Sequence, residues 1–307
     1  MEPTPKIRLK PRPVLALALV LVAVLGLITR GTQSSNLAIV PATSAGGHPV
    51  TTTTVGLSPA VQDASIYRAP GGGCGLNEGP VKPAGPIGRC RVLEFGDSIG
   101  IDLGEGLSRE VTLRNGVNLS IHSKVSTGLV NTSYFNWPAR LRYLIGKFRP
   151  QLVVAFVGAN DQHSIRVGDS SARFGSSRWQ SAYLTRIREI AADVRAGRGY
   201  LLWVGLPPMQ DWRYERGAKL INSLIERVAR TTAGMAYIST VKVFSTPAGR
   251  YEQWAQVNGV PSELRAADGI HLRRVGDDVL ATYVVRQIAR IYHVALFPRL
   301  PRVVTAW

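Results

Sequence analysis

Two short runs of the sequence are apolar throughout, and they constrain the fold more than any other feature. The runs are LVVAFVG, residues 152–158, and YLLWVGL, residues 200–206. Strands that are covered on both faces have this composition, whereas strands with one face in water alternate apolar and polar residues. The two runs therefore predict buried strands of a parallel sheet with helices on both sides.

The segments around these runs alternate between strand and helix patterns. Further strands are expected at residues 91–96, 119–125 and 236–243. Apolar residues at helical spacing follow at 179–194 and 279–291, and Asn136 with Pro138 marks a helix entry, because proline suits the first helical turn. This order predicts a three-layer α/β/α sandwich, whose site lies at the carboxyl ends of the strands.

The N-terminal part of the chain has a different composition. Four basic residues precede VLALALVLVAVLGLIT, residues 14–29, which carries no charge. As a helix this segment covers about 24 Å, which suits a signal-peptide core or a short anchor. Because no small-x-small cleavage site follows closely, we expect an uncleaved membrane anchor with its basic end in the cytoplasm.

The predicted domain organisation follows from these composition changes. The expected parts are the anchor or signal segment at 1–30, a Ser/Thr/Gly/Pro-rich linker at 31–88, a catalytic domain at 89–295 and a tail at 296–307. The catalytic domain is then expected outside the cytoplasm, either anchored or secreted. Export leads to an oxidising compartment, so Cys74 and Cys90 are predicted to form a disulfide.

The formal net charge is +17, from 37 basic and 20 acidic residues. A basic surface suits an anionic partner, but it also serves solubility. The arginines are scattered and no long basic run follows residue 30, so no nucleic-acid partner is expected. No cysteine, histidine or carboxylate grouping has metal-ligand spacing, so neither a metal nor a cofactor is expected.

Four polar segments follow predicted strands or precede the last helix. They are GDSIG at 96–100, STGL at 126–129, GAND at 158–161 and DGIHL at 268–272. In a parallel sheet all four open onto one edge. Ser98 is then a candidate nucleophile, His271 its base, and Asp268 the group that orients the imidazole.

Acyl transfer also needs donors for the oxyanion that forms on the attacked carbonyl. The backbone N–H groups of Ser98 and Gly128 and the side-chain amide of Asn160 are the candidates. Asp97 and Asp161 are interpreted as turn-forming hydrogen-bond acceptors rather than catalysts.

These four segments resemble the four blocks of the SGNH (GDSL-type) hydrolase superfamily. The resemblance covers about residues 91–291, and the Ser, Gly, Asn and His of the blocks correspond to Ser98, Gly128, Asn160 and His271. The segments STGLVNTSYFNWP and LRAADGIHL resemble an exported bacterial group within the superfamily. The resemblance implies a flavodoxin-like sandwich and esterase or acyltransferase activity on lipids or carbohydrates.

Other interpretations of the same residues remain open. GDSIG also matches the G-x-S-x-G nucleophile elbow of α/β-hydrolases, but Ser98 follows the first strand of the domain, and the acid and base lie only three residues apart. His163 is a candidate substrate contact. The segment 164–179 is expected to be a long polar loop beside the site, and the segment 244–267 leads into the turn that carries Asp268 and His271. Both segments are candidates to shape substrate choice. Their aromatic and arginine side chains (Trp179, Tyr251, Trp254 and Arg265) suit sugars and anions, or else pack the loops onto the sheet.

Three functions are compatible with the sequence. The first is an exported serine esterase that removes acetyl or other short acyl groups from a cell-envelope glycan or a small ester. The second is an O-acyltransferase that uses the same three residues. The third is a non-catalytic, membrane-tethered binding module.

Overall fold

The structure is a computed structural model that describes residues 90–112, 117–292 and 305–306. The expected anchor at 1–30 and the linker at 31–88 lie outside the described residues. No helix in the described part of the chain is long and apolar enough to span a membrane. Cys90 is buried and disulfide-bonded. Cys74, the only other cysteine, also lies outside the described residues, so its pairing with Cys90 stays a prediction.

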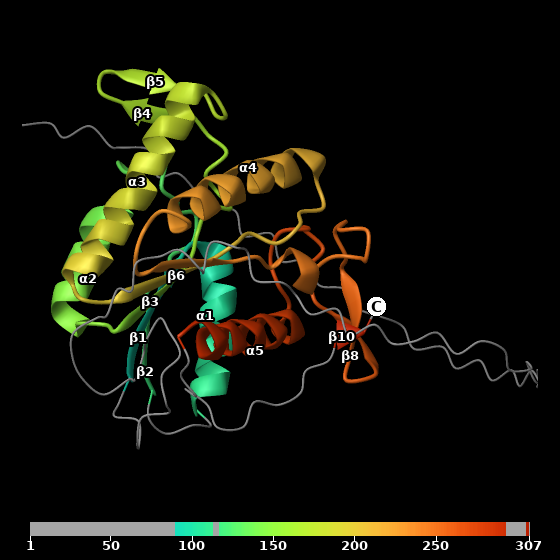
Figure 1. Cartoon of the computed structure of the whole chain (residues 1–307). Helices are drawn as coiled ribbons and strands as arrows, with labels where there is room; N and C mark the ends of the chain where they lie inside the picture. Colours follow the sequence, from blue (N-terminus) through green and yellow to red (C-terminus); the bar gives the residue numbers. More distant parts are fainter. Residues whose placement is uncertain (1–89, 113–116, 293–304, 307) are drawn as a thin grey trace, which may run out of the picture. The chain divides into compact units, whose positions relative to one another are not determined.

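A five-stranded parallel sheet forms the centre of the domain (Figure 1). Its strands are β1 Cys90–Gly96, β2 Val117–Ile121, β3 Leu152–Phe156, β6 Tyr200–Val204 and β7 Met235–Ile238. The order is β2-β1-β3-β6-β7, and every neighbouring pair is parallel. The sheet therefore has the flavodoxin-like order and confirms the predicted fold class.

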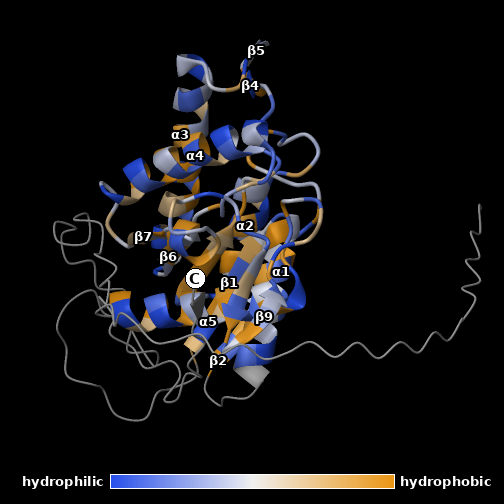
Figure 2. Ribbon diagram, turned by 90° about the vertical axis from the view of Figure 1, so that its right-hand side faces the viewer, coloured by the Kyte–Doolittle hydropathy of each residue, from blue (hydrophilic) through white to orange (hydrophobic). Residues whose placement is uncertain are grey.

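Two helical layers cover the sheet. The helices are α1 Ser98–Thr112, α2 Trp137–Phe148, α3 Ser177–Ala196, α4 Trp212–Ala229 and α5 Arg274–Ile291. α1 packs against α5, whereas α2 packs against α3 and α3 against α4, which gives the two layers seen in Figure 1. Every residue of β3 and β6 is buried, as their apolar composition predicts. Figure 2 shows these apolar segments at the centre and polar residues on the outer helix faces.

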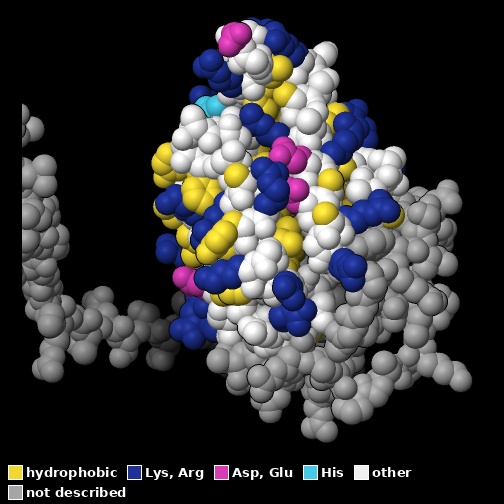
Figure 3. All heavy atoms as spheres, turned by 90° about the vertical axis from the view of Figure 1, so that its left-hand side faces the viewer, with side chains coloured by type: hydrophobic (Ala, Val, Ile, Leu, Met, Phe, Trp, Pro, Cys, Tyr) yellow, Lys and Arg dark blue, Asp and Glu magenta, His cyan; other side chains and the backbone are white. Residues whose placement is uncertain are grey.

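The entry of α2 follows the predicted proline signal. The Asn136 side chain accepts a hydrogen bond from the Ala139 N–H group, and Pro138 occupies the first turn. On the face formed by α2 and α3, Lys and Arg side chains are spread among apolar and neutral ones (Figure 3).

Two predicted strands end well before the expected residue. β2 ends at Ile121, so His122 lies just after the strand rather than within it. The segment expected as a strand to residue 243 ends at Ile238 and continues into η2, a 3-10 turn over Val241–Val243. β2 is an edge strand with no fully buried residue, so its apolar pattern is weak.

Each of the two segments that were expected to shape substrate choice contains a hairpin. In the segment 164–179, β4 Ile165–Val167 pairs with β5 Ser170–Ala172, and α3 begins at Ser177. In the segment 244–267, β8 Trp254–Val257 pairs with β9 Val260–Glu263, and β10 Thr305–Ala306 pairs with β8. The β8–β9 turn uses Asn258 and Gly259, both with positive φ, which is the backbone that tight hairpins require.

Candidate active site

Ser98 is the first residue of α1 and follows β1 through a tight turn. Gly96 ends β1 so close to β3 that a Cβ atom there would lie 2.1 Å from the Phe156 carbonyl oxygen. Only glycine therefore fits at the end of the strand. The turn leaves the Ser98 side chain half-buried at the carboxyl edge of the sheet.

The Ser98 hydroxyl and two side chains of the 268–271 segment form a hydrogen-bonded chain. His271 Nε2 lies 2.8 Å from Ser98 Oγ, and His271 Nδ1 lies 2.7 Å from Asp268 Oδ2. An ionised carboxylate only accepts hydrogen bonds, so Nδ1 carries the proton in the neutral ring. Nε2 is then the acceptor for the Ser98 hydroxyl.

Asp268 is fixed by its own turn. Its Oδ1 accepts hydrogen bonds from the backbone N–H groups of Ile270, at 2.9 Å, and His271, at 3.0 Å. Partial burial raises the pKa of Asp268, but the hydrogen bonds from the His271 ring and from these N–H groups outweigh it and hold the pKa at about 2. The carboxylate therefore stays ionised beside the imidazole near neutral pH.

The 268–272 turn is held from two further sides. Arg265 is fully buried and donates hydrogen bonds to the carbonyl oxygens of Pro208, at 2.7 Å, and Ile270, at 2.9 Å. Asp102 Oδ2, on α1, accepts from the Leu272 N–H at 2.9 Å. Arg265 is thus a packing residue and not a surface contact for an anion.

The aromatic side chains of the two segments differ in whether they pack inside the protein or face solvent. Trp179 is fully buried and stacks on Tyr183 at a ring distance of 4.7 Å, so it packs the core. The ring of Tyr251 lies 5.0 Å from the Arg265 guanidinium. Trp254 is 54% exposed on β8 and remains accessible to a partner.

Two buried carboxylates tie together the three segments that carry the candidate oxyanion donors. Asp97 Oδ2 accepts hydrogen bonds from the Gly158 and Ala159 N–H groups, both at 2.9 Å, and Oδ1 accepts from the Ile99 N–H at 3.1 Å. Asp97 thereby links the Ser98 turn to the segment that carries Asn160. Burial, only partly offset by these bonds, raises the pKa of Asp97 to about 7.

Asp161 makes the second link. Its two oxygens accept hydrogen bonds from the Leu129 and Val130 N–H groups, both at 3.0 Å. Burial raises the pKa of Asp161, against the effect of these bonds. A Cβ atom at Gly128 would lie 2.1 Å from Asp161 Oδ1, so the close approach of this carboxylate requires glycine there. Both aspartates are acceptors, as predicted, but their bonds span separate loops.

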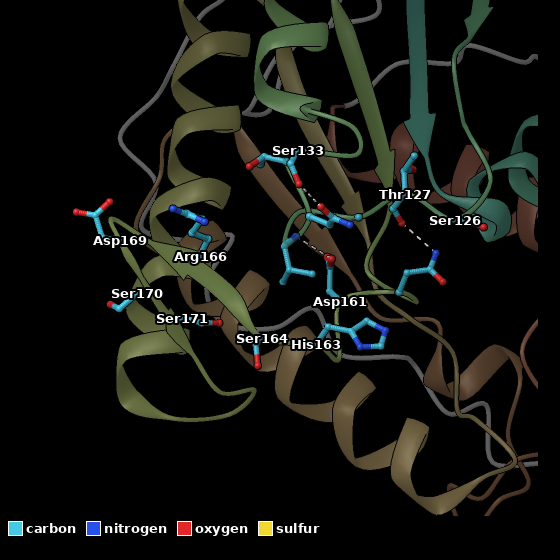
Figure 4. Close-up of a pocket in the computed structure, with 15 residues that line it drawn as sticks. Ser126, Thr127, Ser133, Asp161, His163, Ser164, Arg166, Asp169, Ser170 and Ser171 are labelled. Atoms are coloured by element: carbon cyan, nitrogen blue, oxygen red, sulfur yellow. Dashed lines mark hydrogen bonds between the residues drawn. The ribbon is translucent and has the colours of Figure 1, made fainter.

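Asn160 is placed beside the Gly128 loop. Its Nδ2 donates one hydrogen bond to the Thr127 carbonyl oxygen at 2.9 Å. A side-chain amide carries two N–H bonds, so a second remains for a ligand. Asn160 and Gly128 both line a groove of about 560 Å³, and His163 lies exposed in the same groove (Figure 4).

Sequence reasoning missed one residue that supports this site, Asp102, and left the role of Arg265 open between anion binding and packing. Asp102 lies four positions after Ser98 on α1, a spacing that places two side chains on one helix face and could have indicated it. Arg265 takes the packing role, which the sequence alone could not separate from anion binding because arginine is rarely fully buried. Within the described residues, no group of three or more His, Cys, Asp or Glu side chains could hold a metal ion.

The sheet order, with the Ser98, Gly128, Asn160 and His271 segments at its carboxyl edge, is the arrangement that the resemblance to the SGNH hydrolase superfamily implies. The chain belongs to the family described as "Protein of unknown function (DUF459)", whose model matches residues 91–287.

Similar solved structures include a GDSL-like lipase from Bacteroides thetaiotaomicron, with 16% identity and a TM-score of 0.47 over 65% of this chain and 88% of the lipase. Another is a mutant of an acetyl-xylooligosaccharide esterase from Geobacillus, with 17% identity and a TM-score of 0.44 over 66% of this chain and 95% of the esterase. No curated protein matches the sequence.

Proposed function

We propose that this chain is a serine esterase that hydrolyses short acyl esters, with O-acetyl groups on cell-envelope carbohydrate as the preferred substrate class. The observation that carries the proposal is the chain of two hydrogen bonds, 2.8 Å from Ser98 to His271 and 2.7 Å from His271 to Asp268. A serine hydroxyl is a weak nucleophile until a positioned base removes its proton, and this arrangement supplies that base.

In the proposed acylation step, Ser98 Oγ attacks the ester carbonyl while its proton moves to His271 Nε2. Asp268, ionised and hydrogen-bonded to Nδ1, stabilises the resulting imidazolium. The N–H groups of Ser98 and Gly128 and the free N–H of Asn160 are the proposed donors to the oxyanion. When the tetrahedral intermediate collapses, the C–O bond to the alcohol breaks and His271 protonates the departing oxygen.

In the deacylation step, water attacks the acyl-Ser98 ester and gives its proton to His271. The second tetrahedral intermediate releases the carboxylic acid, and the proton returns from His271 to Ser98 Oγ. An O-acyltransferase would use the same acyl-enzyme but let a sugar hydroxyl attack in place of water. The two functions therefore differ only in the acceptor.

The test compares p-nitrophenyl acetate, butyrate and palmitate as substrates of the full chain. Ser98→Ala should lower kcat/KM for the acetate by at least about 10³-fold. Ser98, His271 and Asp268 act as one unit, and without the Ser98 hydroxyl the other two have no nucleophile to activate. Ser223→Ala, on the outer side of α4, is the matched control and should keep wild-type kinetics. Equal rates in folded Ser98→Ala and wild type would exclude the mechanism. Acylation that appears only when a glycan acceptor is added would indicate the transferase instead.

We also propose that the domain works outside the cytoplasm on a membrane tether. The uncharged segment 14–29 with its basic flank supports this placement. Protease added to intact spheroplasts should degrade the domain. Protection of the domain by the intact inner membrane would contradict the proposal.

A further inference from the structure

The groove beside the oxyanion loops has two walls that come from distant parts of the sequence. One wall is the loop 126–133, and the other is the segment 160–171, which includes β4 and the start of β5 (Figure 4). Gly128 and Asn160 lie in this groove, whereas Ser98, Asp268 and His271 do not line it. The groove therefore extends away from the reacting hydroxyl on the side of the oxyanion donors.

The groove is lined mainly by hydroxyl and amide groups. Seven of its fifteen lining residues are serine or threonine, two are asparagine, and Val130 is the single aliphatic side chain. Val130 is only 5% exposed, so it offers almost no apolar surface. A long acyl chain gains affinity by leaving water for apolar surroundings, and this groove cannot provide them.

Several of these hydroxyl groups are available to a ligand. Ser126 and Thr132 on one wall, and Ser164 and Ser171 on the other, make no side-chain hydrogen bond to any residue that the structure describes. Each hydroxyl both donates and accepts, so together the two walls present paired donors and acceptors across the groove. A ligand with many hydroxyl groups of its own can satisfy both walls at once.

From this lining we infer that the groove is a carbohydrate subsite that holds one or two sugar rings of the ester substrate next to the oxyanion donors. This inference rests on the proposed esterase function for its role in turnover. The volume of about 560 Å³ lies within the range of roughly 300–1,000 Å³ typical of small-ligand sites. The subsite explains how a site on an open sheet edge could select a glycan ester over a lipid ester.

Binding is measured in the Ser98→Ala protein, so that the ligand is not hydrolysed during titration. The probes are mono-O-acetylated cellobiose, xylobiose and chitobiose, titrated by calorimetry, with p-nitrophenyl palmitate as the lipid-like competitor. At least one disaccharide should bind saturably. Adding Ser164→Tyr to the Ser98→Ala protein fills the groove. The Kd for the disaccharide should then rise by at least about tenfold, because space and hydrogen bonds are both lost.

The matched control is Ser181→Tyr, also added to Ser98→Ala. Ser181 is an exposed residue of α3 that does not line the groove, so the Kd for the disaccharide should stay within about twofold of that of Ser98→Ala. The double change Thr132→Val with Ser171→Ala removes one hydroxyl from each wall without filling space. It serves as a second test if Ser164→Tyr does not fold. Unchanged disaccharide binding in a folded groove variant, or preferred binding of the palmitate ester, would overturn the subsite.

Turnover by the wild type separates the two proposals. If wild type hydrolyses p-nitrophenyl acetate but Ser98→Ala binds no disaccharide, the subsite is wrong and the esterase stands. If Ser98→Ala binds a disaccharide in a groove-dependent way but wild type hydrolyses no ester, the subsite stands and the esterase is wrong.

Discussion

Replacing Asp161 by asparagine should damage the site although Asp161 touches no reacting atom. The carboxylate accepts three hydrogen bonds inside the protein, from the Leu129 and Val130 N–H groups at 3.0 Å and from the Tyr183 hydroxyl at 2.8 Å. Asparagine has one acceptor oxygen. If that oxygen replaces Oδ2, it keeps the bonds to Leu129 and Tyr183, and the NH₂ group then faces the Val130 N–H.

The magnitude follows from this mismatch. One buried N–H loses its acceptor, which costs about 1–3 kcal/mol, and a donor–donor contact adds to that. Removal of a buried charge offsets part of the loss, since burial already raises the pKa of Asp161. We expect a net decrease of about 1–3 kcal/mol in the free energy of unfolding. The Gly128 loop loses one of its two backbone hydrogen bonds to residue 161, and displacement of the Gly128 N–H as an oxyanion donor lowers kcat by up to about 10²–10³.

Urea denaturation measures the free energy of unfolding of Asp161→Asn, and p-nitrophenyl acetate turnover measures its kcat. Tyr183→Phe is one control, because it removes a single donor and leaves both backbone bonds in place. Asp169→Asn is the other, because Asp169 is exposed and has no hydrogen bond to any described residue. Asp169→Asn should stay within about 0.5 kcal/mol of wild-type stability. Tyr183→Phe should lose about 1.5–3 kcal/mol, because its buried hydroxyl donates to a carboxylate, but it should keep wild-type kcat. Wild-type kcat in a folded Asp161→Asn variant would refute the argument that Asp161 positions the Gly128 loop.

Two further predictions concern buried ionisable groups. Arg265→Met should lower the free energy of unfolding by about 2–4 kcal/mol and kcat by about tenfold or more, since the carbonyls of Pro208 and of Ile270 in the 268–272 turn lose their buried donor. Arg265→Lys should recover part of both losses in the same denaturation and turnover assays. Burial raises the pKa of Glu94 from 4.5 to about 8, so the folded state holds a proton that the unfolded chain releases, and stability falls as pH rises through that window. Glu94→Gln should reduce this slope in urea denaturation at a series of pH values, and an unchanged slope would refute the assignment.

The parallel sheet was predictable because its central strands are buried on both faces. β3 and β6 lie within the apolar runs that the sequence shows, although each run extends two residues past its strand. The β8–β9 hairpin carries a sequence signal, Asn258 followed by Gly259, which is typical of a tight turn between two strands. The β4–β5 hairpin has only three residues in each strand, too few for a periodic pattern.

The candidate site was predictable in its residues but not in its supports. Ser98 and His271 lie 173 positions apart, and a parallel sheet brings both to one edge. The links made by Asp97 and Asp161 are tertiary hydrogen bonds between loops, and their partners are backbone N–H groups that carry no sequence signal. The groove depends on two loops meeting, which composition alone does not predict.

The central claim is that Ser98 is a nucleophile activated by His271, and covalent labelling tests it most directly. A fluorophosphonate probe should modify the full chain at Ser98, as identified by peptide mass spectrometry. His271→Ala should label far more slowly, and Ser98→Ala should not be labelled at all. Labelling of folded Ser98→Ala to the wild-type extent, or no labelling of Ser98 in an active wild-type preparation, would contradict the account.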